Sequence, residues 1–378
     1  MGAWRTIAVI FMRLEWLSLT EFRSYRLLRL TFSHRMSVFV GPNGSGKTNL
    51  LEAASLLTPG RGLRGARLAD LQRHDAPAHW AVAGRVSGRD LGTGASVSAR
   101  VGGGERRAFY VDGEPVRGQA SFASLFACTW LTPQMDRLFT EGAAGRRRFL
   151  DRLVLALEPG HAKEVASFEA AALNRNRRLA EGHFDPAWLS TIEDAMARHA
   201  VAMTASRRVL IRQLNEAMAG QAAAPFPHVK LSLDCPIAAR LAQAPALAVE
   251  DWLRQNLAAA RTRLTPMISP QRADLMLHDG TTGRPAGVSS TGQQKAMLIG
   301  VILGHAALIA RMRQLSPVLL LDEPLTHLDE AHRHALFACL SAGRAQVLLT
   351  GTDNDVFAPL RGTAAFYEVG EDRVALQS

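Results

Sequence analysis

Apolar and polar residues alternate in two short runs near the amino end of the chain. Arg13–Leu19 and Leu28–Phe32 show this period of two around Glu21–Tyr25, which predicts two strands joined by a turn. Met36–Val40 is a short apolar strand, and Lys47–Leu57 has helical spacing with its apolar residues on one side. The sequence therefore predicts strands, a glycine-rich loop and a helix in that order.

The pattern changes to helical further along the chain. Strand-like alternation continues from Trp80 to Val116, with turn signals at Gly102–Gly104 and at Asp112–Gly113. From about Gly145 to Gly220 the chain is rich in Ala, Leu, Arg and Glu at helical spacing, with a break near Gly182–Pro186. We expect several helices in this part of the chain.

A small-residue linker at Gln221–Pro227 precedes a short strand at His228–Leu233 and a helix at Ala248–Thr262, after which strands and helices alternate to the end. We therefore predict an α/β fold in which residues 12–150 and 263–378 are the two halves of one lobe. Residues 151–262 form an inserted, mostly helical arm, which is tolerable because loop-closure entropy grows slowly with loop length.

The glycine-rich loop carries a complete phosphate-binding motif. The stretch Phe39–Ala53 reads FVGPNGSGKTNLLEA and contains G-x-x-x-x-G-K-[ST] between a predicted strand and a predicted helix. The backbone N–H groups of this loop can surround a phosphate, Lys47 can reach the β- and γ-phosphates, and the Thr48 hydroxyl can ligate Mg²⁺. The predicted nucleotide-binding residues are Gly41, Pro42, Asn43, Gly44, Ser45, Gly46, Lys47, Thr48 and Asn49.

An acidic pair follows a second buried strand. Pro317–Glu330 reads PVLLLDEPLTHLDE, and its four apolar residues Val318–Leu321 predict a strand covered on both faces. Asp322 and Glu323 then emerge at the carboxyl edge of the sheet, where such folds bind ligands. We expect Asp322 to hold Mg²⁺ and its water shell, and Glu323 to polarise the water that attacks the nucleotide.

A polar turn between these motifs indicates a second anion site. Ser289–Lys295 reads SSTGQQK and stands directly before the apolar run Ala296–Ala310, so its backbone N–H groups lie at a helix start. An ordinary helix cap has the same composition. In this order of motifs, however, we expect the turn to cap a nucleotide held by a second copy, with two nucleotides between two protomers related by twofold symmetry.

Composition adds two constraints. There are 44 basic and 34 acidic residues, a net charge of +10, which is typical of proteins that bind polyanions and also of an arginine-rich proteome. Three isolated cysteines indicate a reducing compartment and no zinc site. The run Ala296–Ala310 is too short to span a bilayer, and no cleavable signal is recognisable at MGAWRTIAVIF. We expect a cytoplasmic protein without a membrane partner.

The order of motifs resembles the ABC ATPase superfamily, and within it the RecF family, over nearly everything from Met12 onward. The matching stretches are LEWLSLTEFRSYRLLRLTF, PGRGLRGARLADL and LTPQMDRLFTEGAAGRRRFLD; ISPQRADL matches with departures at Ser269, Gln271 and Ala273. The resemblance implies a P-loop ABC-type ATPase head with a mixed sheet and an inserted helical lobe.

The resemblance also implies roles for individual residues. It makes Ser290, Thr291, Gly292 and Gln293 the signature that acts in trans, with Thr291 in place of the usual first glycine. It implies Gln134 as a Mg²⁺ ligand, Asp329 as the aspartate after the acidic strand, and Arg23 of the F-R-x-Y piece as an ATP-binding residue. Thr350 and Thr352 stand where a transporter ATPase has its switch histidine.

By the same resemblance, the expected activity is slow, DNA-stimulated hydrolysis of ATP with Mg²⁺ in an ATP-dependent homodimer on gapped or duplex DNA. RecO and RecR are the implied partners, RecA is loaded with their help, and the protein is expected at the nucleoid. The candidate contacts with DNA phosphates are Arg61, Arg64, Arg67, Arg73, Arg146, Arg147 and Arg148, with Arg175, Arg177 and Arg178 in the arm. Each cluster could equally be a solvated face. With no sequence-reading motif present, we expect salt-sensitive binding to the DNA backbone.

Two other functions fit some of the motifs. The energy-coupling subunit of a membrane transporter shares the phosphate loop, but usually has a histidine near Thr350 and a shorter interval than the roughly 156 residues between Gln134 and Ser290. A regulatory ATP sensor would need no Glu323. Repair ATPases of the SMC type place long coiled coils in this interval, and sustained heptads are absent here.

Overall fold

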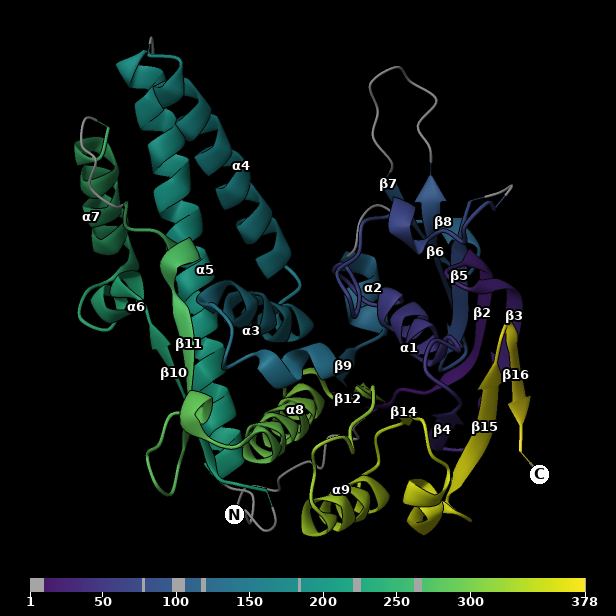
Figure 1. Cartoon of the computed structure of the whole chain (residues 1–378). Coiled ribbons are helices and arrows are strands. Elements are labelled where there is room, and N and C mark those ends of the chain that lie inside the picture. Colours follow the sequence, from purple (N-terminus) through teal and green to yellow (C-terminus); the bar gives the residue numbers. More distant parts are fainter. Residues whose placement is uncertain are drawn as a thin grey trace, which may run out of the picture. The chain divides into compact units, whose positions relative to one another are not determined.

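The computed structural model describes residues 10–76, 79–96, 106–116, 120–182, 185–219, 226–261 and 267–377. The chain divides into two compact units (Figure 1). The sheet unit comprises Met1–Asp136, Ala223–Pro227 and Ser290–Ser378, and the helical unit comprises Arg137–Ala222 and His228–Ser289.

The first sheet of the sheet unit is the one that carries the phosphate loop. Its six strands follow the order β16-β15-β4-β14-β13-β9, all parallel except β16, which is antiparallel to β15. These strands are Arg373–Leu376, Ala364–Gly370, Met36–Val40, Val347–Gly351, Val318–Leu321 and Cys128–Leu131. Every residue of β4, β14, β13 and β9 is buried, as expected for central parallel strands covered on both faces.

The second sheet is antiparallel, with the order β3-β2-β5-β6-β7-β8. Its strands are Tyr25–Thr31, Leu14–Phe22, Ala81–Val86, Arg89–Ser96, Arg106–Val111 and Glu114–Pro115. Helix α1 (Lys47–Leu56) contacts β13 and β14 of the first sheet and β5 of the second, so it lies between the two sheets (Figure 1). The short helix α2 (Ala120–Leu125) precedes β9.

Two further helices complete the sheet unit. Helix α8 (Thr291–Arg313) contacts β9 and the short strand β12 (Leu315–Ser316), which pairs with β1 (Ile10–Phe11). By length and composition α8 could cross a membrane, but 67% of its most apolar window is buried inside the protein. Its apolar residues therefore belong to the core. Helix α9 (Glu330–Ala342) follows the acidic strand end.

The helical unit is built around a long antiparallel pair of helices, α4 and α5, which lie side by side (Figure 1). Its helices α3 to α7 are Ala143–Leu157, His161–Ala180, Pro186–Ala219, Pro236–Leu241 and Ala246–Ala259. Buried residues of α4, α5, α6 and α7, such as Phe168, Met196 and Leu253, form its core. A two-stranded ribbon, β10 (Val229–Asp234) with β11 (Asp274–Asp279), completes the unit.

The strands and helices expected from periodicity are present, but the helical unit is larger than the expected arm of residues 151–262. It includes α3 at one end and β11 at the other, because β11 pairs with β10 along six residues and Arg146 of α3 forms an ion pair with Asp274 of β11. The expected turn at Gly102–Gly104 and most of the linker Gln221–Pro227 lie outside the described residues.

Candidate nucleotide site

The phosphate loop connects the end of β4 to the start of α1, as the motif requires. Nζ of Lys47 donates hydrogen bonds of 2.7 Å to the carbonyl oxygens of both Gly41 and Pro42, so the side chain folds back under the loop. Burial lowers the pKa of Lys47, and the nearby carboxylates of Glu323 and Asp322 oppose that shift. The ammonium is therefore held at the base of a loop whose backbone N–H groups suit an anion.

Gly46 is fixed as glycine by two independent constraints. Its φ of 97° lies in the left-handed region, and a Cβ atom there would lie 2.7 Å from the Tyr25 hydroxyl and 2.9 Å from Oγ of Ser24. The segment Ser24–Tyr25 thus packs directly against the phosphate loop. Asn49 strengthens this contact, since its side-chain amide donates to Oγ of Ser24 at 3.0 Å.

The acidic strand end lies beside the phosphate loop. The hydroxyl of Thr48 is 3.0 Å from both carboxylate oxygens of Asp322, and the hydroxyl of Thr350 donates to Oδ1 of Asp322 at 2.7 Å. This proximity follows from topology, because β4, β14 and β13 are adjacent parallel strands whose carboxyl ends share one edge. Burial raises the pKa of Asp322, while the hydrogen bonds from Thr350 and Thr48 counteract the rise.

Glu323 adopts a backbone conformation that is unusual for its residue type. Its φ is 46°, and its N–H donates to the Thr350 hydroxyl at 2.9 Å. Its carbonyl oxygen accepts a 3.1 Å hydrogen bond from Nζ of Lys295. A non-glycine residue in this region costs about 1–3 kcal/mol and persists only where its surroundings enforce it. Thr350 and Lys295 therefore fix the direction in which the Glu323 side chain leaves the strand.

The polar turn before α8 forms a complete helix cap. Oγ of Ser290 accepts from the N–H of Gln293 at 3.3 Å, and Oε1 of Gln293 accepts from the N–H of Ser290 at 3.2 Å. Thr291 is the first residue of the helix. A Cβ atom on Gly292 would lie 2.8 Å from the carbonyl oxygen of His327, so the segment after Glu323 passes close to this turn.

The remaining predicted nucleotide residues occupy different environments. Gln134 and Thr352 are exposed, the former in the short 3-10 helix Pro133–Arg137. Asp329 caps α9 by accepting from the N–H of His332 at 2.8 Å. Arg23 is held by a bidentate ion pair with the buried Glu52, with both N–O distances at 2.9 Å.

Two side chains in the site were missed by sequence reasoning. Lys295 is 1% exposed and forms an ion pair of 3.1 Å with Asp136. Glu52, which is fully buried in α1, forms ion pairs with both Arg23 and Arg64. The signal available for Lys295 was its position at the start of a strongly apolar helix, where a charge requires a buried partner. No local pattern identifies Asp136, which is 159 residues away.

Some of the candidate DNA-binding arginines form close ion pairs or hydrogen bonds within the protein, whereas others are accessible to DNA. In the sheet unit, Arg73 pairs with Glu21 at 2.6 Å, and Arg64 donates to Oδ1 of Asn49 at 2.9 Å. Arg67 pairs only loosely with Asp70 at 3.7 Å and is 86% exposed, while Arg61 is exposed with a long 3.5 Å hydrogen bond to Ala66. Arg61 and Arg67 are thus the accessible cations of this segment.

In the helical unit, Arg146 is bidentate to Asp274, Arg147 donates to the Ala273 carbonyl, and Arg148 is exposed. Arg175, Arg177 and Arg178 were expected as further DNA contacts. The assignment of Arg175 is wrong, because this side chain is buried against Glu193 and the carbonyl of Leu257. Arg177 and Arg178 are more exposed and pair with Glu181.

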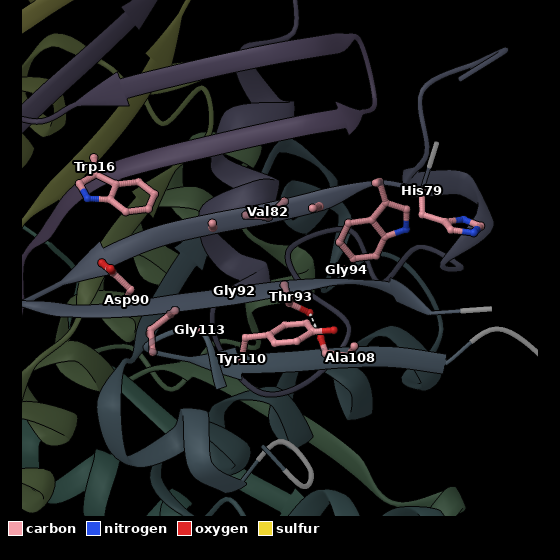
Figure 2. A pocket seen from close by; sticks show the side chains of 14 residues that line it. Trp16, His79, Val82, Asp90, Gly92, Thr93, Gly94, Ala108, Tyr110 and Gly113 are labelled. Carbon is pink, nitrogen blue, oxygen red and sulfur yellow. Dashed lines mark hydrogen bonds between the residues drawn. The ribbon is translucent and has the colours of Figure 1, made fainter. Parts of the chain in front are cut away.

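A groove of about 530 Å³ lies elsewhere on the sheet unit, along the second sheet (Figure 2). Small residues of β5 and β6, including Ala83, Gly92 and Gly94, line it, and Trp16 and Tyr110 contribute aromatic rings from β2 and β7. Arg29 stacks over the Trp16 ring at 4.3 Å. None of the phosphate-loop residues lines this groove, so it is separate from the nucleotide site.

The phosphate loop beside an acidic strand end, in a mixed sheet interrupted by a helical unit, defines the head of a P-loop ATPase of the SMC type. The family model described as RecF/RecN/SMC N terminal domain matches residues 13–372. The chain is 42% identical over 368 residues to the DNA replication and repair protein RecF of Mesorhizobium japonicum, covering 95% of this chain and 96% of that protein. It is 43% identical over 369 residues to the protein of the same name from Agrobacterium fabrum, covering 93% and 96%. The chain belongs to the RecF family.

Solved structures agree on the fold. The structure of the recombination mediator protein RecF-ATPrS in the RecFOR pathway superposes with a TM-score of 0.82 at 19% identity, covering 98% of this chain and all of that chain. The Smc head domain from Pyrococcus furiosus, with an extended coiled coil and bound to the C-terminal domain of ScpA, gives 0.53 at 14% identity, covering 97% and 96%.

Proposed function

We propose that this protein is an ATP-driven clasp for DNA in recombinational repair. Two copies close around two ATP molecules, hold DNA at a gap, and open again after slow hydrolysis. The observation that carries the proposal is the hydrogen-bonded chain from Thr48 through Asp322 and Thr350 to Glu323, which links phosphate binding to the residue that would activate water. The names of the curated relatives, DNA replication and repair protein RecF, support the DNA role.

Nucleotide binding would use the backbone N–H groups from Asn43 to Thr48 and the ammonium of Lys47. A hydroxyl and a carboxylate 3.0 Å apart, Thr48 and Asp322, form a hard oxygen donor set that suits Mg²⁺ together with substrate phosphates. When bound, Mg²⁺ would neutralise charge on the β- and γ-phosphates. Exposed Gln134 would approach the same metal. Arg23, which is held in place by its ion pair with Glu52, would contact the nucleotide.

Hydrolysis requires a base or a water-positioning group, and Glu323 would serve in that role. Its backbone is fixed by Thr350 and Lys295, so its side chain is directed rather than free. Slow turnover is a useful property for a clasp, since the closed state then persists long enough for other proteins to act on the DNA.

Dimer closure would bring the turn Ser290, Thr291, Gly292 and Gln293 of one copy onto the γ-phosphate held by the other. Asp329, at the start of α9, would lie near the same junction. Thr350 and the exposed Thr352 would replace the switch histidine of transporter ATPases. This arrangement makes the dimer dependent on ATP.

DNA contact would come from the accessible arginines Arg61, Arg67 and Arg148, and the binding would be independent of sequence. The proposed partners are RecO and RecR, with RecA as the protein that is finally loaded, in the cytoplasm at the nucleoid. The similar solved structure is that of a recombination mediator protein of the RecFOR pathway, which supports this assignment of partners.

Sedimentation of the purified protein with Mg²⁺ and ATP, with and without gapped duplex, tests the proposal. The wild type should convert from monomer to dimer with ATP, Glu323→Gln should accumulate as a dimer on DNA, and Lys47→Ala should remain monomeric. A wild-type protein that stays monomeric with ATP and ignores DNA would overturn the clasp. The alternative of a transporter subunit is disfavoured, since the relatives compared above are repair proteins.

A further inference from the structure

Lys295 is a buried cation that the nucleotide-binding scheme above does not use. Its side chain is 1% exposed, although it lies only four residues after Thr291, the first residue of α8. Its ammonium donates to Oδ2 of Asp136 and to the carbonyl oxygen of Glu323, both at 3.1 Å. Burying an ammonium is costly unless it is paired and hydrogen-bonded, so both contacts are needed to keep it in place.

The two contacts join three separate parts of the site. Asp136 belongs to the short 3-10 helix Pro133–Arg137, two residues after Gln134. Glu323 ends the acidic strand with its φ of 46°. Lys295 itself extends from the helix whose first turn is the polar Ser290–Gln293 sequence. A single side chain therefore connects the polar turn with the segment of Gln134 and with the backbone of the proposed catalytic residue.

The polar turn is also in direct contact with the segment that follows Glu323. A Cβ atom on Gly292 would lie 2.8 Å from the His327 carbonyl, so the polar turn is already in close contact with the chain that follows Glu323. A shift of the first turn of α8 must then move Lys295, and through it Asp136 and the Glu323 carbonyl. Packed contacts of this kind favour discrete arrangements over continuous deformation.

We propose that Lys295 is a positioning residue that sets the orientation of Glu323 and of the Gln134 segment according to the position of the polar turn. This inference rests on the proposed function. In the dimer the turn of one copy caps the nucleotide of the other. Closure at one nucleotide therefore adjusts Glu323 in the copy that supplies the turn, and the two sites hydrolyse ATP cooperatively.

The test compares Lys295→Met with wild type in steady-state hydrolysis and in equilibrium binding of ATP. Methionine keeps most of the volume and removes the donor and the charge. We expect kcat to fall roughly 10- to 100-fold, the scale expected for a misplaced catalytic group, while the Kd for ATP stays within about twofold. The Hill coefficient for ATP should fall toward one, and Lys295→Arg should restore part of kcat and cooperativity.

Asp136→Asn provides a second variant should Lys295→Met fail to fold. Asp136 is 15% exposed, and asparagine has the same shape. This variant removes the charge that pairs with Lys295 and should lower kcat in the same direction. The double variant should be no worse than Lys295→Met alone, because Lys295→Met already removes the contact that Asp136→Asn weakens. Wild-type kcat and cooperativity in a folded Lys295→Met or Asp136→Asn protein would overturn the inference.

Glu323→Gln separates this inference from the proposed function. If Glu323→Gln hydrolyses ATP as fast as wild type, the assignment of the catalytic residue fails. If Glu323→Gln is inactive and Lys295→Met is fully active, only the positioning role fails.

Discussion

The hydroxyl of Thr350 donates a 2.7 Å hydrogen bond to Oδ1 of Asp322, between two adjacent parallel strands. The same hydroxyl accepts the N–H of Glu323 at 2.9 Å, so its hydrogen-bonding capacity is used in both directions. A single buried side chain thus holds the proposed metal ligand and the proposed catalytic residue in one geometry.

Thr350→Val removes this hydroxyl while keeping the shape of the side chain. The pKa of Asp322 is raised by burial and held down in part by Thr350, so the variant should raise it further. Asp322 then remains protonated up to a higher pH, and the acidic limb of kcat/KM with Mg²⁺ should move to higher pH. Thr350→Ser is the control and should keep the wild-type limb. An unchanged limb in Thr350→Val would contradict the role of this hydrogen bond.

The phosphate loop can require glycine because φ is positive or because a Cβ atom would clash with a neighbour, and comparing Gly46 with Gly44 distinguishes the two reasons. Both have positive φ, 97° and 84°, but a Cβ atom on Gly46 would clash with the Tyr25 hydroxyl, whereas Gly44 has nothing within 4 Å. Gly44→Ala should cost about 1–2 kcal/mol from backbone strain alone. Gly46→Ala should cost more and should abolish nucleotide binding, because the loop must shift. Thermal unfolding and nucleotide affinity of both variants would check this, and equal effects would contradict the clash.

Glu52 is a buried residue of α1 that forms ion pairs with two arginines, one before and one after this helix. Its carboxylate is fully buried, binds Arg23 through two bonds of 2.9 Å and lies 3.4 Å from Arg64. Glu52→Gln should destabilise the protein by about 3 kcal/mol, because it leaves the Arg23 guanidinium without its counter-charge. Asp70→Asn, at an exposed pair of 3.7 Å with Arg67, should cost less than about 1 kcal/mol. Urea unfolding of both variants measures the difference.

Much of the sheet unit could be predicted because its information is local. The buried strands Met36–Val40 and Val318–Leu321 read as apolar runs, and the phosphate loop is a contiguous motif between a strand and a helix. The adjacency of Thr48 and Asp322 also follows from sequence, since parallel strands end at one edge. Helical spacing likewise predicted the helices of the second unit.

The parts that sequence reasoning missed depend on partners distant in the chain. Arg175 reads as one of several arginines on a polar helix face, yet its charge is neutralised by Glu193 on the next helix. Arg146 reads the same way, and its partner Asp274 lies 128 residues further on. The boundary of the helical unit was missed for a related reason, because a ribbon between residues 229 and 279 is specified by strand pairing and not by composition.

Asp151 and Arg207 provide a pH-dependent contribution to the stability of the helical unit. Although burial alone would raise the pKa of Asp151, hydrogen bonds from His161 and Arg207 hold it below its usual value. The stabilisation is therefore present above the unfolded-state pKa of about 4 and is lost as pH falls through the lower folded-state pKa. Arg207→Met should cost about 3 kcal/mol at neutral pH and should flatten the loss on acidification. Arg212→Met, at an exposed site on the same helix, should leave the urea midpoint and its pH dependence unchanged.

Whether each candidate arginine is exposed or held in a close ion pair predicts how its replacement changes the salt dependence of DNA binding. Arg61, Arg67 and Arg148 are exposed, with at most loose contacts, and each one that meets a DNA phosphate contributes to the release of counterions. Alanine at such a position should reduce the slope of log K against log salt by about 0.9 for duplex DNA, without altering thermal stability. Arg146→Ala should instead destabilise the helical unit, because it leaves the Asp274 carboxylate without its bidentate partner. Binding titrations from about 50 to 200 mM salt measure the slopes, and unchanged slopes in all three exposed variants would exclude these arginines from the DNA interface.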